Sequence, residues 1–199
     1  MKISTIIVSS LLAVSLGNAQ TCSYTQKGSV DIGFTAFKTP LKVGVGGHFN
    51  EVGFSTNVQG ANSLDALLVG ATLHVNKKSV NTNNSGRDVT LTTSFFDVLN
   101  GDDISAKVLE IKEEVTKAGD VQRGIMTTRI TLNDVTVKVP LRYHIEKGVM
   151  KGEGTIDLLD FKANNALESI NKACFDLHKG KTWADVVVSF SMNIDTKCK

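Results

Sequence analysis

The stretch 135-VTVKVPLRYHI-145 decides the fold of this chain, because its apolar and polar residues alternate without a break. One phase is apolar throughout and consists of Val135, Val137, Val139, Leu141, Tyr143 and Ile145. The other phase carries Thr136, Lys138, Pro140, Arg142 and His144. A period of two is typical of a β-strand with one face on a core and the other in water. The stretch therefore predicts a half-buried strand.

The same alternation recurs along most of the chain. It is clear at residues 30–36 and 184–194, and weaker runs lie at 49–55, 66–76, 104–113, 122–132 and 149–158. Turn residues such as Asn100-Gly101 and Lys147-Gly148 separate neighbouring runs. Short connections and one buried face favour an antiparallel sheet of about eight strands. Such a sheet either closes into a barrel wide enough for a slender ligand or packs as a sandwich.

Two segments depart from this rhythm and predict helices. Residues 163–178 place Leu167, Ile170, Cys174 and Leu177 three or four positions apart, which puts Cys174 on a buried helical stripe. That position favours a buried free thiol over a disulfide partner. A shorter helical turn, capped by Ser85, is expected through Arg87 to Asp97.

The N-terminus has the pattern of a cleaved export signal. Lys2 precedes an apolar core at residues 6–16, and small residues occupy the positions before a cut at Gln20. Residues 1–19 are therefore expected to be a signal peptide, and residues 20–199 a single exported domain. The apolar core is too short to span a bilayer and no second one follows, so stable membrane insertion is not expected.

Charge and cysteine content narrow the partners further. The chain has 22 basic and 20 acidic residues, and this balance does not favour a nucleic-acid partner. Export permits disulfides, and the three cysteines leave one thiol over. Cys22 and Cys198 lie at opposite ends of the mature chain, and they can be bridged if the first and last strands pair antiparallel.

No constellation of reactive residues points to catalysis or to a metal. The four histidines lie on separate predicted elements, so they are interpreted as isolated surface residues. There is no Gly-x-Ser-x-Gly motif, and 44-GVGG-47 lacks the ending and the helix of a phosphate-binding loop. We therefore expect no catalytic residues, no metal site and no cofactor.

The nine phenylalanines are spread over almost every predicted element. They either pack a filled core or line a cavity that holds an apolar ligand, and composition does not separate the two.

The stretch 79-SVNTNNSGRDVTLTTSFFDV-98 resembles a motif of the YceI-like family, the exported lipid-binding and polyisoprenoid-binding barrels of bacteria. In both, Ser-Val-x-Thr is followed by Arg-Asp and then by Phe-Phe. The stretches 130-ITLNDVTVKVPL-141 and 154-GTIDLLDF-161 are also similar to family strands. Many members have histidine at the place of Thr90 and glycine at that of Asp134, so this chain resembles a divergent subgroup.

The resemblance implies an all-β fold, namely an eight-stranded antiparallel barrel that is lipocalin-like and carries one or two short helices. Arg87 and Asp88 are then expected to clamp the barrel mouth, either as a fold-holding ion pair or through ligand contact. Phe95 and Phe96 either pack in the core or line the channel. The predicted ligand-binding set is Phe34, Phe37, Arg87, Asp88, Phe95, Phe96 and Phe190.

The expected function, as the resemblance implies, is to bind or carry a long apolar ligand in the barrel channel, in the periplasm. The ligand would be an isoprenoid, a quinone precursor or a fatty acid derivative. One alternative is a ligand-free stress-response or interaction module with a filled barrel, and a lipid-modifying enzyme is a weaker one. The expected partner is an amphiphilic small molecule, and a homodimer is compatible with the sequence.

Overall fold

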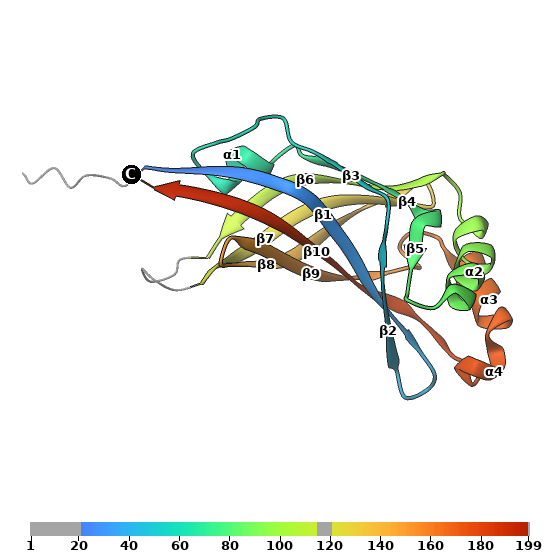
Figure 1. Ribbon diagram of the computed structural model, residues 1–199. Helices are drawn as coiled ribbons and strands as arrows, with labels where there is room; N and C mark the ends of the chain where they lie inside the picture. Colours follow the sequence, from blue (N-terminus) through green and yellow to red (C-terminus); the bar gives the residue numbers. More distant parts are fainter. Residues whose placement is uncertain (1–20, 115–120, 199) are drawn as a thin grey trace, which may run out of the picture.

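The computed structural model describes residues 21–114 and 121–198, so the expected signal peptide lies outside the described residues. The fold is mostly β, with a few short helices (Figure 1). The strands are β1 (Cys22–Lys38), β2 (Val43–Phe49), β3 (Val52–Ser55), β4 (Thr72–Asn76), β5 (Val80–Asn81), β6 (Asp103–Glu113), β7 (Gln122–Leu132), β8 (Val135–Glu146), β9 (Val149–Asp157) and β10 (Thr182–Cys198). The helices are α1 (Leu64–Leu68), η1 (Lys77–Ser79), α2 (Ser85–Ser94), η2 (Phe96–Val98), α3 (Asn164–Ala173) and α4 (Phe175–His178).

All strands join one antiparallel sheet in the order β3-β4-β6-β7-β8-β9-β10-β1-β2-β5. This sheet has ten strands where about eight were predicted. The glycine-rich β2 escaped detection because three of its seven residues have no side chain to show alternation. The predicted strand 66–76 was also partly wrong, because its first residues belong to α1, which Ser63 caps by accepting from the Ala66 amide.

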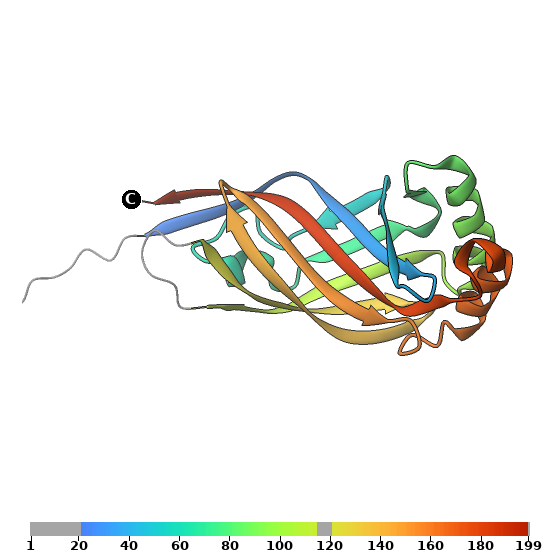
Figure 2. The same cartoon turned by 90° about the horizontal axis from the view of Figure 1, so that it is seen from below.

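The sheet curls so strongly that its two edges lie close together (Figures 1 and 2). Only Asn50 and Glu51 separate β2, near one edge, from β3 at the other. The Asn50 amide donates to the Ser79 carbonyl at 2.9 Å, and the Asn76 amide donates to the Glu51 carbonyl at 3.1 Å. These bonds continue the pairing across the bend, so the sheet surrounds an interior.

At one end of the curled sheet, buried apolar side chains fill the interior. The first and last strands pair in register from Cys22 opposite Cys198, and these two cysteines are disulfide-bonded. Helix α1 lies toward the same end (Figure 1). Several side chains in this part of the core are almost completely buried: Leu64, Leu67, Leu68, Met150 and Ile194. Burial of these residues closes this end to a ligand.

Helices α2, α3 and α4 gather at the opposite end (Figures 1 and 2). Asn84, and not the predicted Ser85, caps α2, because its side chain accepts from the Arg87 amide. The predicted helix 163–178 is broken at Cys174 into α3 and α4. That break turns Leu177 outward, where it is 75% exposed, so its predicted place on a buried stripe was wrong.

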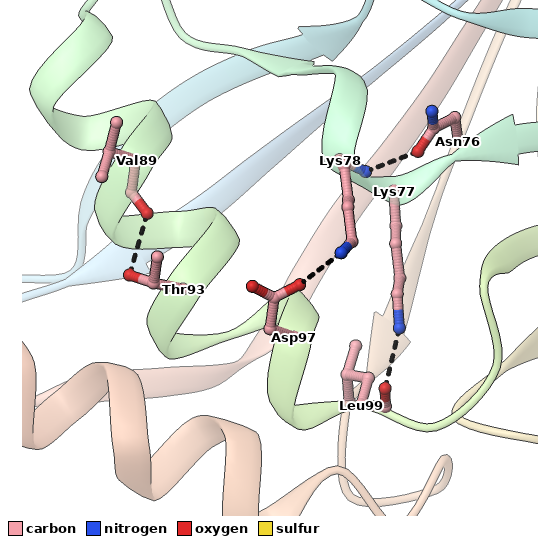
Figure 3. A network of polar contacts seen from close by, with 7 residues as sticks. All are labelled: Asn76, Lys77, Lys78, Val89, Thr93, Asp97 and Leu99. Atoms are coloured by element: carbon pink, nitrogen blue, oxygen red, sulfur yellow. Dashed lines mark hydrogen bonds and ion pairs between the residues drawn. The ribbon is translucent and has the colours of Figure 1, made fainter.

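Polar contacts fasten the segment that follows α2 to the sheet (Figure 3). Lys77 is only 4% exposed, and its ammonium donates to the Leu99 carbonyl at 2.7 Å. Next to it, Lys78 forms an ion pair with Asp97 at 3.1 Å. Because a buried ammonium needs a strong acceptor, the Lys77 bond holds the end of η2 against η1.

Candidate functional site

A cavity of about 630 Å³ lies inside the curled sheet and extends toward the helical end. Its wall is mainly apolar, because the alternating strands turn one phase of their side chains inward. Val30, Met126 and Val186 are among these side chains, and Leu167 and Ile170 of α3 cover them. The volume falls within the range of roughly 300–1,000 Å³ that ligand pockets occupy.

Six of the seven predicted ligand-binding residues line this cavity: Phe34, Phe37, Arg87, Phe95, Phe96 and Phe190. They come from β1, α2, η2 and β10 and from the residue that ends α2, so they are distant in sequence. The curl of the sheet brings them together. Asp88 is not among the lining residues.

Four phenylalanines form a continuous aromatic wall. The ring centroids of Phe34 and Phe49 are 5.6 Å apart, those of Phe49 and Phe96 are 5.8 Å apart, and those of Phe95 and Phe96 are 5.2 Å apart. Both contacts of Phe96 are edge-to-face, an arrangement that aromatic quadrupoles favour. Phe96 is 6% exposed and the other three are half-buried. The wall therefore serves both the core and the cavity.

The predicted clamp between Arg87 and Asp88 has a different arrangement. The Asp88 carboxylate accepts from the Thr82 amide at 2.9 Å and from the Thr82 hydroxyl at 2.6 Å. It thereby ties α2 to the end of β5. Within the described residues no carboxylate forms an ion pair with Arg87. The prediction of a fold-holding ion pair between Arg87 and Asp88 was therefore wrong. Arg87 lines the cavity instead.

Two hydrogen bonds at the helical end determine which ring nitrogen of His178 carries the hydrogen. The Thr182 hydroxyl donates to Asn171 Oδ1 at 2.9 Å, and His178 Nδ1 lies 2.7 Å from the same hydroxyl oxygen. The hydroxyl has one hydrogen, so Nδ1 must be the donor to it. Nε2 then remains an acceptor when the ring is neutral.

The electrostatics favour that neutral ring. Burial, and secondarily the nearby Lys38 ammonium, lower the pKa of His178 below its usual value. His178, Thr182 and Lys38 all line the cavity. Sequence reasoning interpreted this histidine as an isolated surface residue, because its partners Asn171 and Thr182 are joined to it only by the fold.

Cys174 is a free, half-buried thiol and also lines the cavity. Burial raises its pKa, and the Lys38 ammonium opposes this in part. The sequence favoured a free thiol here, although the stripe on which it was placed does not continue to Leu177. A neutral thiol in this position adds to the apolar wall.

The interior contains few polar groups. The Thr128 hydroxyl is buried and donates to the Val139 carbonyl at 3.0 Å. In the described ranges, no three metal-binding side chains are close enough to hold an ion. No helix in the described part of the chain is long and apolar enough to cross a bilayer. The arrangement is therefore an apolar cavity with Lys38, Arg87 and His178 among its few charged or titratable groups.

Residues 25–195 match the model of the YceI-like domain. The chain belongs to the YceI-like family. The resemblance seen in the sequence is therefore confirmed, and it covers most of the chain. No protein with a curated description matches this family member significantly.

Three solved structures show the same YceI-like fold at low identity. A polyisoprenoid-binding domain from Saccharophagus degradans is 14% identical, with 87% of this chain and 98% of that chain covered and a TM-score of 0.57. BcnA of Burkholderia cenocepacia is 13% identical, with 83% and 96% covered and a TM-score of 0.56. The YceI protein of Campylobacter jejuni is 18% identical, with 96% and 99% covered and a TM-score of 0.55.

Proposed function

We propose that this protein binds a long apolar molecule, such as an isoprenoid, a quinone precursor or a fatty acid derivative, and carries it without changing it chemically. The observation that carries the proposal is the apolar cavity of about 630 Å³ inside the sheet. The polyisoprenoid-binding domain of Saccharophagus degradans, which has the same fold, supports this ligand class. An empty space of this size also favours the carrier over a filled, ligand-free module.

In this proposal the sheet is counted as a barrel of eight strands, because two pairs of short strands are each continuous along the chain. Strands β2 and β3 count as one bent strand, and β4 and β5 count as another that η1 interrupts. These two composite strands pair with each other: β2 pairs with β5 on one side of the bend, and β3 pairs with β4 on the other. This way of counting supports the lipocalin-like, eight-stranded barrel predicted from the sequence, with its open space at the helical end.

Apolar burial supplies the affinity. Burying about 400 Å² of hydrocarbon at about 25 cal/mol per Å² gives roughly 10 kcal/mol before the cost of ordering the ligand. The aromatic wall of Phe34, Phe49, Phe95 and Phe96 would contact the chain along one side. This free energy is sufficient for micromolar binding.

The polar groups of the lining set the position of the head group. The Arg87 guanidinium can hold a carboxylate or another anionic oxygen in a bidentate pair. Lys38 adds a second positive charge, and neutral His178 offers an acceptor to a hydroxyl. The ligand is therefore amphiphilic, with its chain inside and its polar end near Arg87.

The compartment in this proposal is the periplasm. The disulfide between Cys22 and Cys198 is typical of an oxidising compartment. The signal-peptide pattern of residues 1–19 agrees with export. A homodimer remains a prediction from the sequence.

Native mass spectrometry of the exported protein, followed by organic extraction, tests the proposal. We expect an apolar adduct at one molecule per chain that solvent releases. Ala36 lines the cavity, so Ala36→Trp should abolish the adduct, while Thr35→Trp on the opposite phase of β1 should retain it. A protein that is always empty, and that takes up neither polyprenyl nor acyl lipids, would overturn the carrier function.

A further inference from the structure

The helical end exposes large apolar side chains to solvent. We call Leu41, Val43, Phe175 and Leu177 the rim patch. Leu41 is 84% exposed, Leu177 75%, Phe175 59% and Val43 46%. Two of them belong to the hairpin that joins β1 to β2, and two belong to α4. Single exposed leucines are common, but four large apolar residues at one end of a domain call for a partner.

The hairpin and α4 lie at the same end of the molecule (Figures 1 and 2), and specific bonds join the hairpin to the chain that leads from α4 into β10. The Thr39 amide donates to the Lys181 carbonyl at 2.8 Å, and Trp183 Nε1 donates to the Thr39 carbonyl at 2.8 Å. Lys42 forms an ion pair with Asp185 at 2.7 Å. The hairpin is therefore fixed to the segment that directly follows α4, which places both parts of the rim patch at the helical end.

The rim patch borders the cavity. Leu177 both belongs to the patch and lines the cavity, and its neighbours His178 and Trp183 also line it. Phe37, which lies four residues before Leu41, lines the cavity from the hairpin side. A surface that covers the rim patch would therefore face the cavity directly.

The charge around the rim patch is positive. Residues 38–43 and 172–185 contain five lysines against two acidic residues, Asp176 and Asp185. Because Asp185 is paired with Lys42, the charges that remain are four lysines and Asp176. Lys42 lies over the rings of Phe37 and Trp183, each at 5.1 Å, and Lys181 lies over Trp183 at 4.6 Å. The lysines thus lie among the apolar side chains, on an otherwise nearly neutral protein.

We propose that the rim patch docks on the surface of an anionic lipid bilayer, with the cavity facing the membrane. Leucine and phenylalanine side chains enter the boundary between head groups and acyl chains, while lysines around them contact lipid phosphates. Tryptophan is enriched at this depth, and long lysine side chains reach outward to the phosphates. A protein partner is the competing occupant, but protein interfaces are depleted in lysine, whereas an anionic bilayer attracts it. This inference does not depend on which molecule the cavity holds.

Vesicle flotation tests the docking. The probe is a vesicle of about one part phosphatidylglycerol to two parts phosphatidylcholine, compared with phosphatidylcholine alone. We expect at least about tenfold stronger binding to the anionic vesicles, and loss of most of that difference in about 0.5 M salt. Trp183 is the only tryptophan, so a blue shift of its emission should accompany binding.

Matched variants separate docking from ligand binding. Leu41→Ser with Phe175→Ser should weaken vesicle binding at least about tenfold, because two apolar side chains that do not line the cavity no longer enter the bilayer. Val58→Ser is the control, since Val58 is also exposed, at 41%, but lies in the loop before α1, away from the rim patch. Uptake of a soluble fluorescent fatty acid, measured in parallel, reports the cavity alone. Equal vesicle binding by the double variant and the parent, or no vesicle binding at all, would overturn the proposal whatever the fatty acid result.

Discussion

Replacing Phe96 by alanine tests whether the aromatic wall holds the fold together. Phe96 is 6% exposed and makes edge-to-face contacts with Phe49 and Phe95, so its removal opens a hole between β2 and η2. Deletion of a buried phenylalanine costs about 3–5 kcal/mol, and each aromatic pair contributes about 0.5–1.5 kcal/mol of such a total. We therefore expect Phe96→Ala to lower the free energy of unfolding by about 4 kcal/mol.

Urea unfolding, followed by far-UV circular dichroism at constant pH, measures this loss. Phe175→Ala is the matched control, because Phe175 is 59% exposed and its removal should change stability by no more than about 0.5 kcal/mol. A double-mutant cycle between Phe49→Ala and Phe96→Ala should give a coupling of about 0.5–1.5 kcal/mol.

Two results would refute this reasoning. A loss below about 1 kcal/mol for Phe96→Ala would mean that the space around Phe96 collapses freely or that the ring is not packed in solution. Additive effects of Phe49→Ala and Phe96→Ala would mean that the two rings do not interact. Either result would leave the wall as a lining of the cavity without a structural role.

Three further predictions follow from groups outside the wall. Replacing Cys22 and Cys198 by serine frees positions that are 176 residues apart, which should lower the unfolding free energy by up to about 5 kcal/mol in a urea titration. The pKa of His178 is lowered in the folded state, so unfolding takes up a proton below about pH 6.5 and stability should fall with acidification. His178→Gln should weaken that dependence in the same assay. Burial raises the pKa of the Cys174 thiol, so its alkylation, followed by mass spectrometry, should be slow at neutral pH and accelerate as pH rises. A bound cavity ligand should slow it further.

The strands were predictable where the sheet buries one face and exposes the other. Residues 135–145 and 184–194 alternate without interruption, and both lie inside long strands, β8 and β10. Alternation failed where side chains are missing, as in β2, and where a short segment is packed on all sides. Helix α1 is an example, because Leu64, Leu67 and Leu68 are all fully buried and a run of five residues does not reveal a helical period.

The lining was predictable in part, because Phe34, Phe37 and Phe190 were among the phenylalanines of the predicted strands and the family motif marked others. The Phe-Phe pair and Arg87 line the cavity, as the motif suggested, whereas Asp88 bonds to Thr82. The hydrogen bonds among Asn171, His178 and Thr182 join α3, α4 and β10. No local pattern in the sequence predicts such contacts. Long-range polar contacts of this kind come from the topology of the sheet.

The two ends of the curled sheet differ in how their interiors are packed. At the disulfide end, Met150 and Ile194 are almost completely buried, and the pairing of β1 with β10 begins at the Cys22–Cys198 bridge. At the helical end the interior is hollow, and an apolar cavity without ligand lowers stability because its lining lacks packing partners. A fold can tolerate that loss where the opposite end and the crosslink stabilise it. On this account, filling the cavity with an apolar ligand should stabilise the protein, and should do so most strongly when the disulfide has been removed and the protein is only marginally stable.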